Sequence, residues 1–183
     1  MPDLLSIKNF SISFDNDGKN NPVVSGINFS LKKGRLTAVV GESGSGKSVT
    51  ALSVLQLLPE STHINGEILF DSGEKTTDLL RLTKKQINTI RGNKISMIFQ
   101  EPMTSLNPVL TCGDQVMEVL IRHKKCSKKE ARQKVIELFR QTGLPNPEAL
   151  IKRYPHQISG GQKQRVMIAM AMSCEPSLLI ADE

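Results

Sequence analysis

The chain has 183 residues, which suits one domain with an inserted subdomain, and its formal net charge at pH 7 is +6. Hydrophobic residues make up 38% and charged residues 23%, a composition typical of an ordinary soluble protein with a buried core. No apolar run approaches the roughly 20 residues that a membrane-spanning helix needs, and the amino terminus lacks a secretory-signal pattern. Cys112, Cys126 and Cys174 form no CxxC pair. This pattern suggests neither a zinc site nor a redox pair, three cysteines are few for a disulfide framework, and a reducing cytoplasm is the simplest interpretation.

The first part of the chain has the pattern of strands. Ile27–Leu31 alternates apolar and polar residues, as a half-buried strand does, and the Asn-, Asp- and Gly-rich residues 15–22 predict a loop or hairpin tip. The short apolar run Leu36–Val40 predicts a buried parallel strand. Apolar residues continue over Lys47–Leu58 until Pro59, so we expect a helix there.

Two further strands and a short helix are expected before residue 100. Asn65 and Gly66 predict a turn, followed by a strand over Glu67–Phe70. Lys84–Arg91 predicts a short helix, and Ile95–Phe99 a second buried strand.

The composition then changes, and residues 101–157 have the pattern of a helical insertion between two parts of an α/β core. Residues 111–142 are helical in pattern, and Ser127 with Glu130 has the S-x-x-E form of a capping box. Gly143 is expected to end that helix. The basic run at 124–129 is interpreted as a solvated helix boundary, with a binding patch as the alternative.

One segment matches G-x-x-x-x-G-K-[ST] in full and predicts a phosphate-binding loop. Its glycines let backbone N–H groups surround phosphates at the positive end of the following helix. Lys47 is expected to reach the β- and γ-phosphates of ATP, and the Ser48 hydroxyl to bind Mg²⁺. The alternative is a chance glycine-rich turn. The predicted ATP-binding residues are Gly41, Glu42, Ser43, Gly44, Ser45, Gly46, Lys47, Ser48 and Val49.

Three polar residues at strand ends complete the expected catalytic set. Asp182 and Glu183 follow the apolar run Leu178–Ala181, and Gln100 follows the strand at Ile95–Phe99. Asp182 suits a water-mediated Mg²⁺ contact, and Glu183 suits the base that polarises the attacking water. Gln100 suits a contact to Mg²⁺ or to that water. In isolation, each could be an ordinary surface residue.

A second glycine-rich segment, Ser159, Gly160, Gly161 and Gln162, precedes an apolar helical stretch and predicts a second anion site. One ATP needs only one such site, which suggests two chains that face each other, with Ser159 and Gly161 contacting the partner's nucleotide. The alternative is a plain helix N-cap. Phe14 is the candidate to stack on adenine, with Phe10 as the competing residue and a core position as the competing interpretation.

Residues 41–50, 98–108 and 154–162 together resemble the oligopeptide/dipeptide permease ATPases, a group of ABC transporter subunits that includes nickel importers. The resemblance implies an α/β fold: a P-loop NTPase core with a parallel sheet, an N-terminal antiparallel β subdomain and an inserted helical subdomain. Within one ABC ATPase domain over 1–183, it implies the β subdomain and P-loop core at 1–100, the insertion at 101–157, and the signature helix and Walker B strand at 158–183.

The resemblance also implies a function and partners. The chain would bind and hydrolyse ATP with Mg²⁺ and power the import of peptides or a related solute. The expected partners are a second, different ATPase subunit, two transmembrane permease subunits and an extracytoplasmic substrate-binding protein, with no nucleic acid. The expected location is the cytoplasmic face of the plasma membrane. The family implies neither the cargo nor the partners' identity.

Two departures bear on activity. Ile158 stands where the family has Leu, a conservative change. The chain ends at Glu183, and His63, His123 and His156 all precede the last strand, so none can be the family's γ-phosphate histidine. We expect a C-terminally truncated sequence, poorly active alone. The alternatives are a soluble ABC ATPase acting on nucleic acid or ribosomes, and a fragment without catalytic activity.

Overall fold

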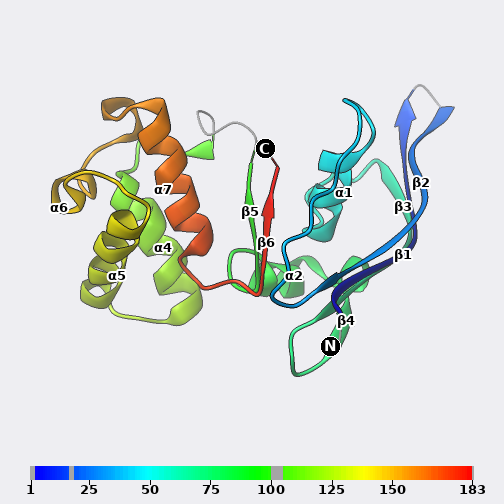
Figure 1. The fold of residues 1–183 in the computed structure, drawn as a ribbon, viewed down its shortest axis with the longest axis horizontal. Helices are drawn as coiled ribbons and strands as arrows, with labels where there is room; N and C mark the ends of the chain where they lie inside the picture. The colour runs from blue at the N-terminus through cyan, green and yellow to red at the C-terminus, as the bar shows by residue number, and fades with distance from the viewer. Residues whose placement is uncertain (1–2, 17–18, 100–104, 183) are drawn as a thin grey trace. The chain divides into compact units, whose positions relative to one another are not determined.

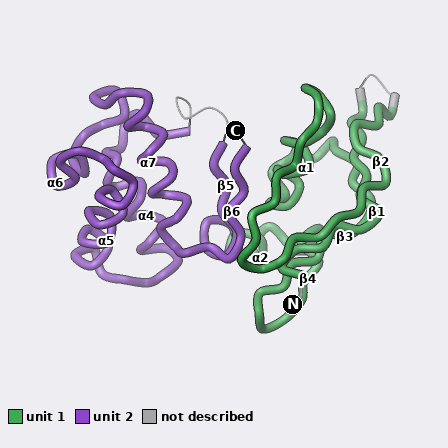
Figure 2. The backbone as a smooth tube through the Cα atoms, viewed as in Figure 1, with its two compact units in different colours: residues 1–88 green, residues 89–183 purple. Residues whose placement is uncertain are grey.

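The computed structural model describes residues 3–16, 19–99 and 105–182. The chain divides into two compact units, residues 1–88 and residues 89–183 (Figures 1 and 2). The first unit holds an antiparallel sheet and the glycine-rich loop, and the second holds a parallel strand pair and the helical insertion.

The first unit is built on a four-stranded antiparallel sheet in the order β2-β1-β3-β4. The strands are β1 (Asp3–Asn16), β2 (Lys19–Lys32), β3 (Thr62–Asp71) and β4 (Thr76–Asp78). The strand predicted at Ile27–Leu31 is confirmed as part of β2. Alternate apolar side chains of β1 and β3 are buried and form the core of this unit; the largest are Leu5, Ile7, Phe10, Ile12, Ile68 and Phe70.

Residues 15–22 were predicted to form a loop or hairpin tip; the hairpin is confirmed, because β1 and β2 pair antiparallel, but the loop is shorter than predicted. Strand β1 continues to Asn16 and β2 starts at Lys19, with these two residues in register. The polar residues there favoured a loop, but cross-strand hydrogen bonding along two long neighbouring strands carries the ladder through them.

The turn predicted at Asn65 and Gly66 is also wrong, because both residues lie inside β3. The pairing of β1 with β3 shifts register between Lys8 and Ser11, which marks a β-bulge. Gly66 has φ of +100°, and a Cβ there would lie 2.5 Å from the Lys8 carbonyl oxygen. Glycine is needed for a close backbone approach in the sheet rather than for a chain reversal.

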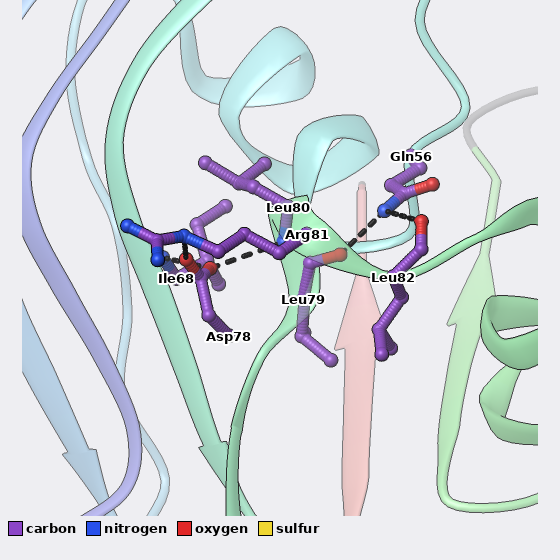
Figure 3. A network of polar contacts seen from close by, with 7 residues as sticks. All are labelled: Gln56, Ile68, Asp78, Leu79, Leu80, Arg81 and Leu82. Carbon is purple, nitrogen blue, oxygen red and sulfur yellow. Dashed lines mark hydrogen bonds and ion pairs between the residues drawn. The ribbon is translucent and has the colours of Figure 1, made fainter.

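Helix α1 (Lys47–Val54) follows the glycine-rich loop and ends earlier than the predicted Leu58. Gln56 takes a left-handed conformation, with φ of 50°, which stops the helix before Pro59 is reached. Its side-chain amide donates to the carbonyl oxygens of Leu79 and Leu82 (Figure 3). These two bonds fix the end of α1 to the short 3₁₀ helix η1 (Leu79–Arg81).

Asp78 connects η1 to strand β3. Its carboxylate accepts hydrogen bonds from the backbone N–H groups of Leu80 and Ile68, at 3.1 and 3.3 Å, and pairs with Arg81 at 3.0 Å (Figure 3). The Asp78 side chain is only 13% exposed. The network therefore joins α1, η1 and β3.

The strand predicted at Leu36–Val40 is not present. These residues have no regular structure, and Leu36, Val39 and Val40 are 101%, 59% and 87% exposed. A buried parallel strand needs hydrogen-bonded neighbours, and in the described part of the chain none of the named strands pairs with this segment. The apolar pattern alone therefore does not produce a strand here.

The second unit combines a parallel pair, β5 (Ile95–Ile98) and β6 (Leu178–Ala181), with a helical region. Both strands were predicted, although β5 ends one residue before Phe99. The short helix α2 (Lys84–Ile90), also predicted, leads into this unit. The other helices are α4 (Cys112–Lys124), α5 (Lys128–Gln141), α6 (Pro147–Leu150), η2 (Pro155–Gln157) and α7 (Gly160–Met172).

The helical region packs around one apolar core drawn from α4, α5 and α7. Its fully buried members include Val116, Leu120, Val135, Phe139 and Val166. The capping box predicted at Ser127 and Glu130 is confirmed: Ser127 caps α5, and the Glu130 carboxylate accepts from the Ser127 backbone N–H at 2.8 Å. The predicted insertion is therefore helical, as two long helices joined by a tight turn.

Candidate nucleotide-binding site

The glycine-rich loop adopts a conformation that requires glycine. Gly44 and Gly46 have φ of +80° and +89°, in the left-handed region that other residues rarely adopt. A Cβ on Gly46 would lie 2.5 Å from Cγ2 of Val24 in β2, so the loop packs closely on the sheet. The glycines at these two positions are fixed by backbone conformation and by packing within the chain.

Gly46 is the N-cap of α1, and as a glycine it has no side chain to cap the first turn. Helix α1 therefore begins with backbone N–H groups that a bound anion can contact, at the positive end of the helix dipole. The residues from Gly41 to Ser45 are exposed, and Ser48 and Val49 are half-buried in the first turn. This is the geometry expected of a phosphate cradle.

Backbone carbonyl groups of the loop hold the Lys47 side chain over the loop. Its ammonium group donates to the carbonyl oxygens of Gly41 and Glu42, at 2.8 and 2.9 Å. The loop also closes on itself, because the Ser45 N–H donates to the Glu42 carbonyl oxygen at 3.2 Å. These contacts place the cation beside the cradle.

The carboxyl ends of β5 and β6 lie side by side in the second unit. Ile98 pairs with Ala181 in the parallel register, and the Asp182 N–H donates to the Ile98 carbonyl oxygen at 3.0 Å. The predicted metal-associated residue Asp182 therefore stands at the edge where parallel strands commonly bind ligands. Gln100 and Glu183 lie outside the described residues, so their predicted roles remain predictions.

The second glycine-rich segment forms the start of α7. Ser159 is the N-cap; its hydroxyl accepts from the Gln162 N–H at 3.3 Å, and the Gln162 side chain accepts from the Ser159 N–H at 3.0 Å. Gly160 and Gly161 are exposed, and a Cβ at either would meet nothing within 4 Å. Nothing within the described chain therefore requires glycine at these two positions.

The two aromatic candidates for adenine stacking differ in burial. Phe10 is fully buried in the core of the first unit, whereas Phe14 is half-buried and pairs with Asn21 and Thr62 across the sheet. A core side chain cannot offer its face to a ligand, so burial removes Phe10 as a competitor. Phe14 stays a prediction.

Sequence reasoning missed the residues that hold α1 in place. Gln56 and Asp78, described above, carry no motif, and Val24 makes its contact with Gly46 from a distant strand. One signal was available for Asp78, since an Asp directly before Leu79 and Leu80 is typical of a helix N-cap.

The described residues show neither a metal-binding cluster nor a membrane-spanning helix. They contain no group of three or more His, Cys, Asp and Glu side chains placed to hold a metal ion. None of their helices combines the length and apolarity needed to span a bilayer.

A glycine-rich cradle at a helix N-terminus, together with an acid at the edge of a parallel strand pair, defines a P-loop nucleotide-binding protein. The model of the ABC transporter family matches residues 24–183, and the chain belongs to that family. The chain shares its fold with the ATP-binding cassette MJ0796, solved as a dimer in a post-hydrolysis state bound to ADP and Pi. The TM-score is 0.83 at 27% identity, over 97% of this chain and 72% of that one.

Two curated relatives are more similar in sequence. The chain is 51% identical to the dipeptide transport ATP-binding protein DppD of Bacillus subtilis, over 100% of this chain and 54% of the relative. It is 50% identical to the oligopeptide transport ATP-binding protein AppD of the same organism, over 100% of this chain and 55% of the relative. The chain thus spans about half the length of these relatives.

Proposed function

We propose that the protein binds and hydrolyses ATP to power an ABC importer for oligopeptides, dipeptides or a related solute such as nickel. The observation that carries this proposal is the phosphate cradle at Gly41–Ser48, with the Lys47 ammonium group anchored beside it. The chain is 51% and 50% identical in sequence to two peptide-transport ATP-binding proteins, and this similarity supports the cargo class.

Each predicted site residue has a separate role in this proposal. Backbone N–H groups of the loop and of the first turn of α1 bind the phosphates, and Lys47 neutralises their charge. Ser48, Asp182 and Gln100 would hold Mg²⁺, which supplies charge neutralisation for phosphoryl transfer. Ser48 opens α1 and Asp182 follows β6, so hydroxyl and carboxylate oxygens suited to this hard cation are present. Glu183 would polarise the attacking water.

The open glycines at the start of α7 support a site shared between two subunits. Because a Cβ at Gly160 or Gly161 would meet nothing within 4 Å among the described residues, the small size of glycine here suits the close approach of a group from outside the chain. We infer that Ser159, Gly160, Gly161 and Gln162 contact ATP bound to a second ATPase subunit, which the resemblance implies is a different chain. Permease subunits, a substrate-binding protein and a location at the cytoplasmic membrane face complete the proposal.

Uptake in cells tests the function and the cargo class together. Cells that lack the gene are supplied with the wild-type protein or with Lys47→Ala, and uptake of a labelled dipeptide and of nickel is measured. We expect the wild type, and not the variant, to restore dipeptide uptake. Equal uptake with both proteins would contradict the catalytic role, and restoration of nickel uptake alone would change the cargo.

A further inference from the structure

The positive charge of this chain is concentrated at one place. Residues 122–134 contain seven Lys and Arg and one Glu, a formal charge of +6, which is also the charge of the whole chain. The other 170 residues contain 17 basic and 17 acidic side chains and are formally neutral. We call residues 122–134 the basic hairpin tip, because they span the end of α4, the turn and the start of α5 (Figure 1).

The cations of the basic hairpin tip are all exposed, and the ion pairs formed by the described residues lie elsewhere in the chain. The one acid of the tip, Glu130, is occupied by the capping box, where it accepts from both the backbone N–H and the hydroxyl of Ser127. The seven cations are Arg122, Lys124, Lys125, Lys128, Lys129, Arg132 and Lys134.

The fold brings these cations together, which sequence alone did not establish. Lys125 takes a left-handed conformation, with φ of 52°, and reverses the chain so that α5 packs back against α4. The N-terminal end of α5 adds its helix dipole to the same region. His123 is half-buried, and burial together with Arg122 and Lys124 lowers its pKa, so it adds no charge at neutral pH.

The tip is separate from the nucleotide elements of its unit. The N-terminus of α7, which carries Ser159 and the open glycines, lies at the other end of this unit from the turn between α4 and α5 (Figure 1). The cluster is therefore not part of the proposed contact with a partner's nucleotide.

We propose that the basic hairpin tip binds an anionic phospholipid surface, and this rests on the proposed function, which places the protein beside a membrane. Clusters of four to eight Lys and Arg next to a bilayer attract acidic headgroups. A shallow groove lined by Met117, Ile121, Arg122 and Lys128 adjoins the tip, and Ile121 is 39% exposed. It offers apolar area beside the cations, although Asp114 and Glu118 also line it.

Nucleic acid is the less favoured partner. The tip contains no Phe, Tyr or Trp on which bases could stack. Because the rest of the chain is formally neutral, no further excess of positive charge is available to follow a phosphate backbone.

Binding of the full-length protein to vesicles tests the proposal. We expect binding to vesicles of phosphatidylglycerol and phosphatidylcholine, loss of binding as salt is raised, and no binding to phosphatidylcholine alone. The variant K124Q/K125Q/K128Q/K129Q should bind on the order of 100-fold more weakly at low salt. The control K32Q/K33Q/K75Q/K85Q, which changes four exposed lysines elsewhere by the same total charge, should bind like the wild type.

A footprint on the unmodified protein gives a test that does not depend on the folding of a variant. Acidic vesicles should protect Lys124, Lys125, Lys128 and Lys129 from acetylation, and leave Lys32, Lys33 and Lys75 reactive. Equal protection of all lysines, equal weakening by both quadruple variants, or stronger competition by DNA than by vesicles would overturn the proposal. The ATPase rate of each variant is measured separately, so failure here is distinguishable from failure of the proposed function.

Discussion

The two glycine-rich helix starts of this chain look alike in sequence and differ in structure. At the start of α1, Gly44 and Gly46 need positive φ, Gly46 packs on Val24, and no side chain caps the helix. At the start of α7, Ser159 and Gln162 complete a capping box, and the glycines meet open space. The conformation and packing of the first site therefore require glycine, whereas no contact among the described residues requires glycine at the second.

The largest effect is expected from the first site. Lys47→Ala should lower the ATPase rate of the full-length protein by about 10²–10³-fold, because a preorganised cation at the phosphates is lost. Unfolding by denaturant should be nearly unchanged, since the hydrogen bonds of Lys47 are exposed to solvent. Lys75→Ala, at an exposed lysine of the same unit, is the matched control, and equal rates in the two variants would contradict the assignment.

Gly46→Ala and Gly161→Ala sharpen the comparison. Gly46→Ala should lower the free energy of unfolding by about 2 kcal/mol, because a Cβ there meets Val24 in a strained backbone conformation. Gly161→Ala should leave it unchanged or raise it by up to about 1 kcal/mol, since alanine favours a helix over glycine. Denaturant titration of both variants checks this, and equal destabilisation would mean that the two helix starts are alike.

The anchor of α1 should contribute a smaller amount. Asp78→Ala removes the carboxylate that accepts from two backbone N–H groups and pairs with Arg81, and should cost about 1–2 kcal/mol of stability. Arg81→Ala, whose side chain is 79% exposed, should cost less than about 0.5 kcal/mol. Thermal unfolding measures the loss of stability in the two variants. An equal loss would contradict the expectation that the buried hydrogen bonds of Asp78 contribute more than its ion pair with Arg81.

The smallest effect concerns the thiols of Cys112 and Cys174, which burial makes unreactive. Burial raises the pKa of the Cys112 thiol to about 11 and also raises the pKa of Cys174, so both thiolates are scarce at pH 8. Only Cys126, which is partly exposed, should react with iodoacetamide under native conditions. Mass spectrometry of the labelled protein measures this, and rapid labelling of Cys112 would show that the helical core opens readily.

Sequence patterns predicted best where local chemistry decides the structure. The capping box at Ser127, the helix after the glycine-rich loop and the strands at Ile95 and Leu178 were all anticipated. Predictions failed where distant contacts decide. Gly66 serves a bulge against Lys8, and the apolar run at Leu36 has no neighbouring strand among the described residues.

The same division holds for the candidate site. Motif spacing identified the cradle at 41–48 and the start of α7, because the chemistry of phosphate binding restricts residue types at fixed positions. It could not show that Lys47 is anchored by Gly41 and Glu42, or that Gly161 faces open space. These properties depend on three-dimensional neighbours.

We propose that Gly161 acts on a nucleotide held by another subunit. The most direct measurement is ATP binding and ATP turnover of Gly161→Ala, with the full-length protein assembled with its partner subunit. We expect Gly161→Ala to bind ATP with wild-type affinity as an isolated protein and to lose most of its ATP turnover in the assembly. Wild-type turnover in the assembled variant would contradict it.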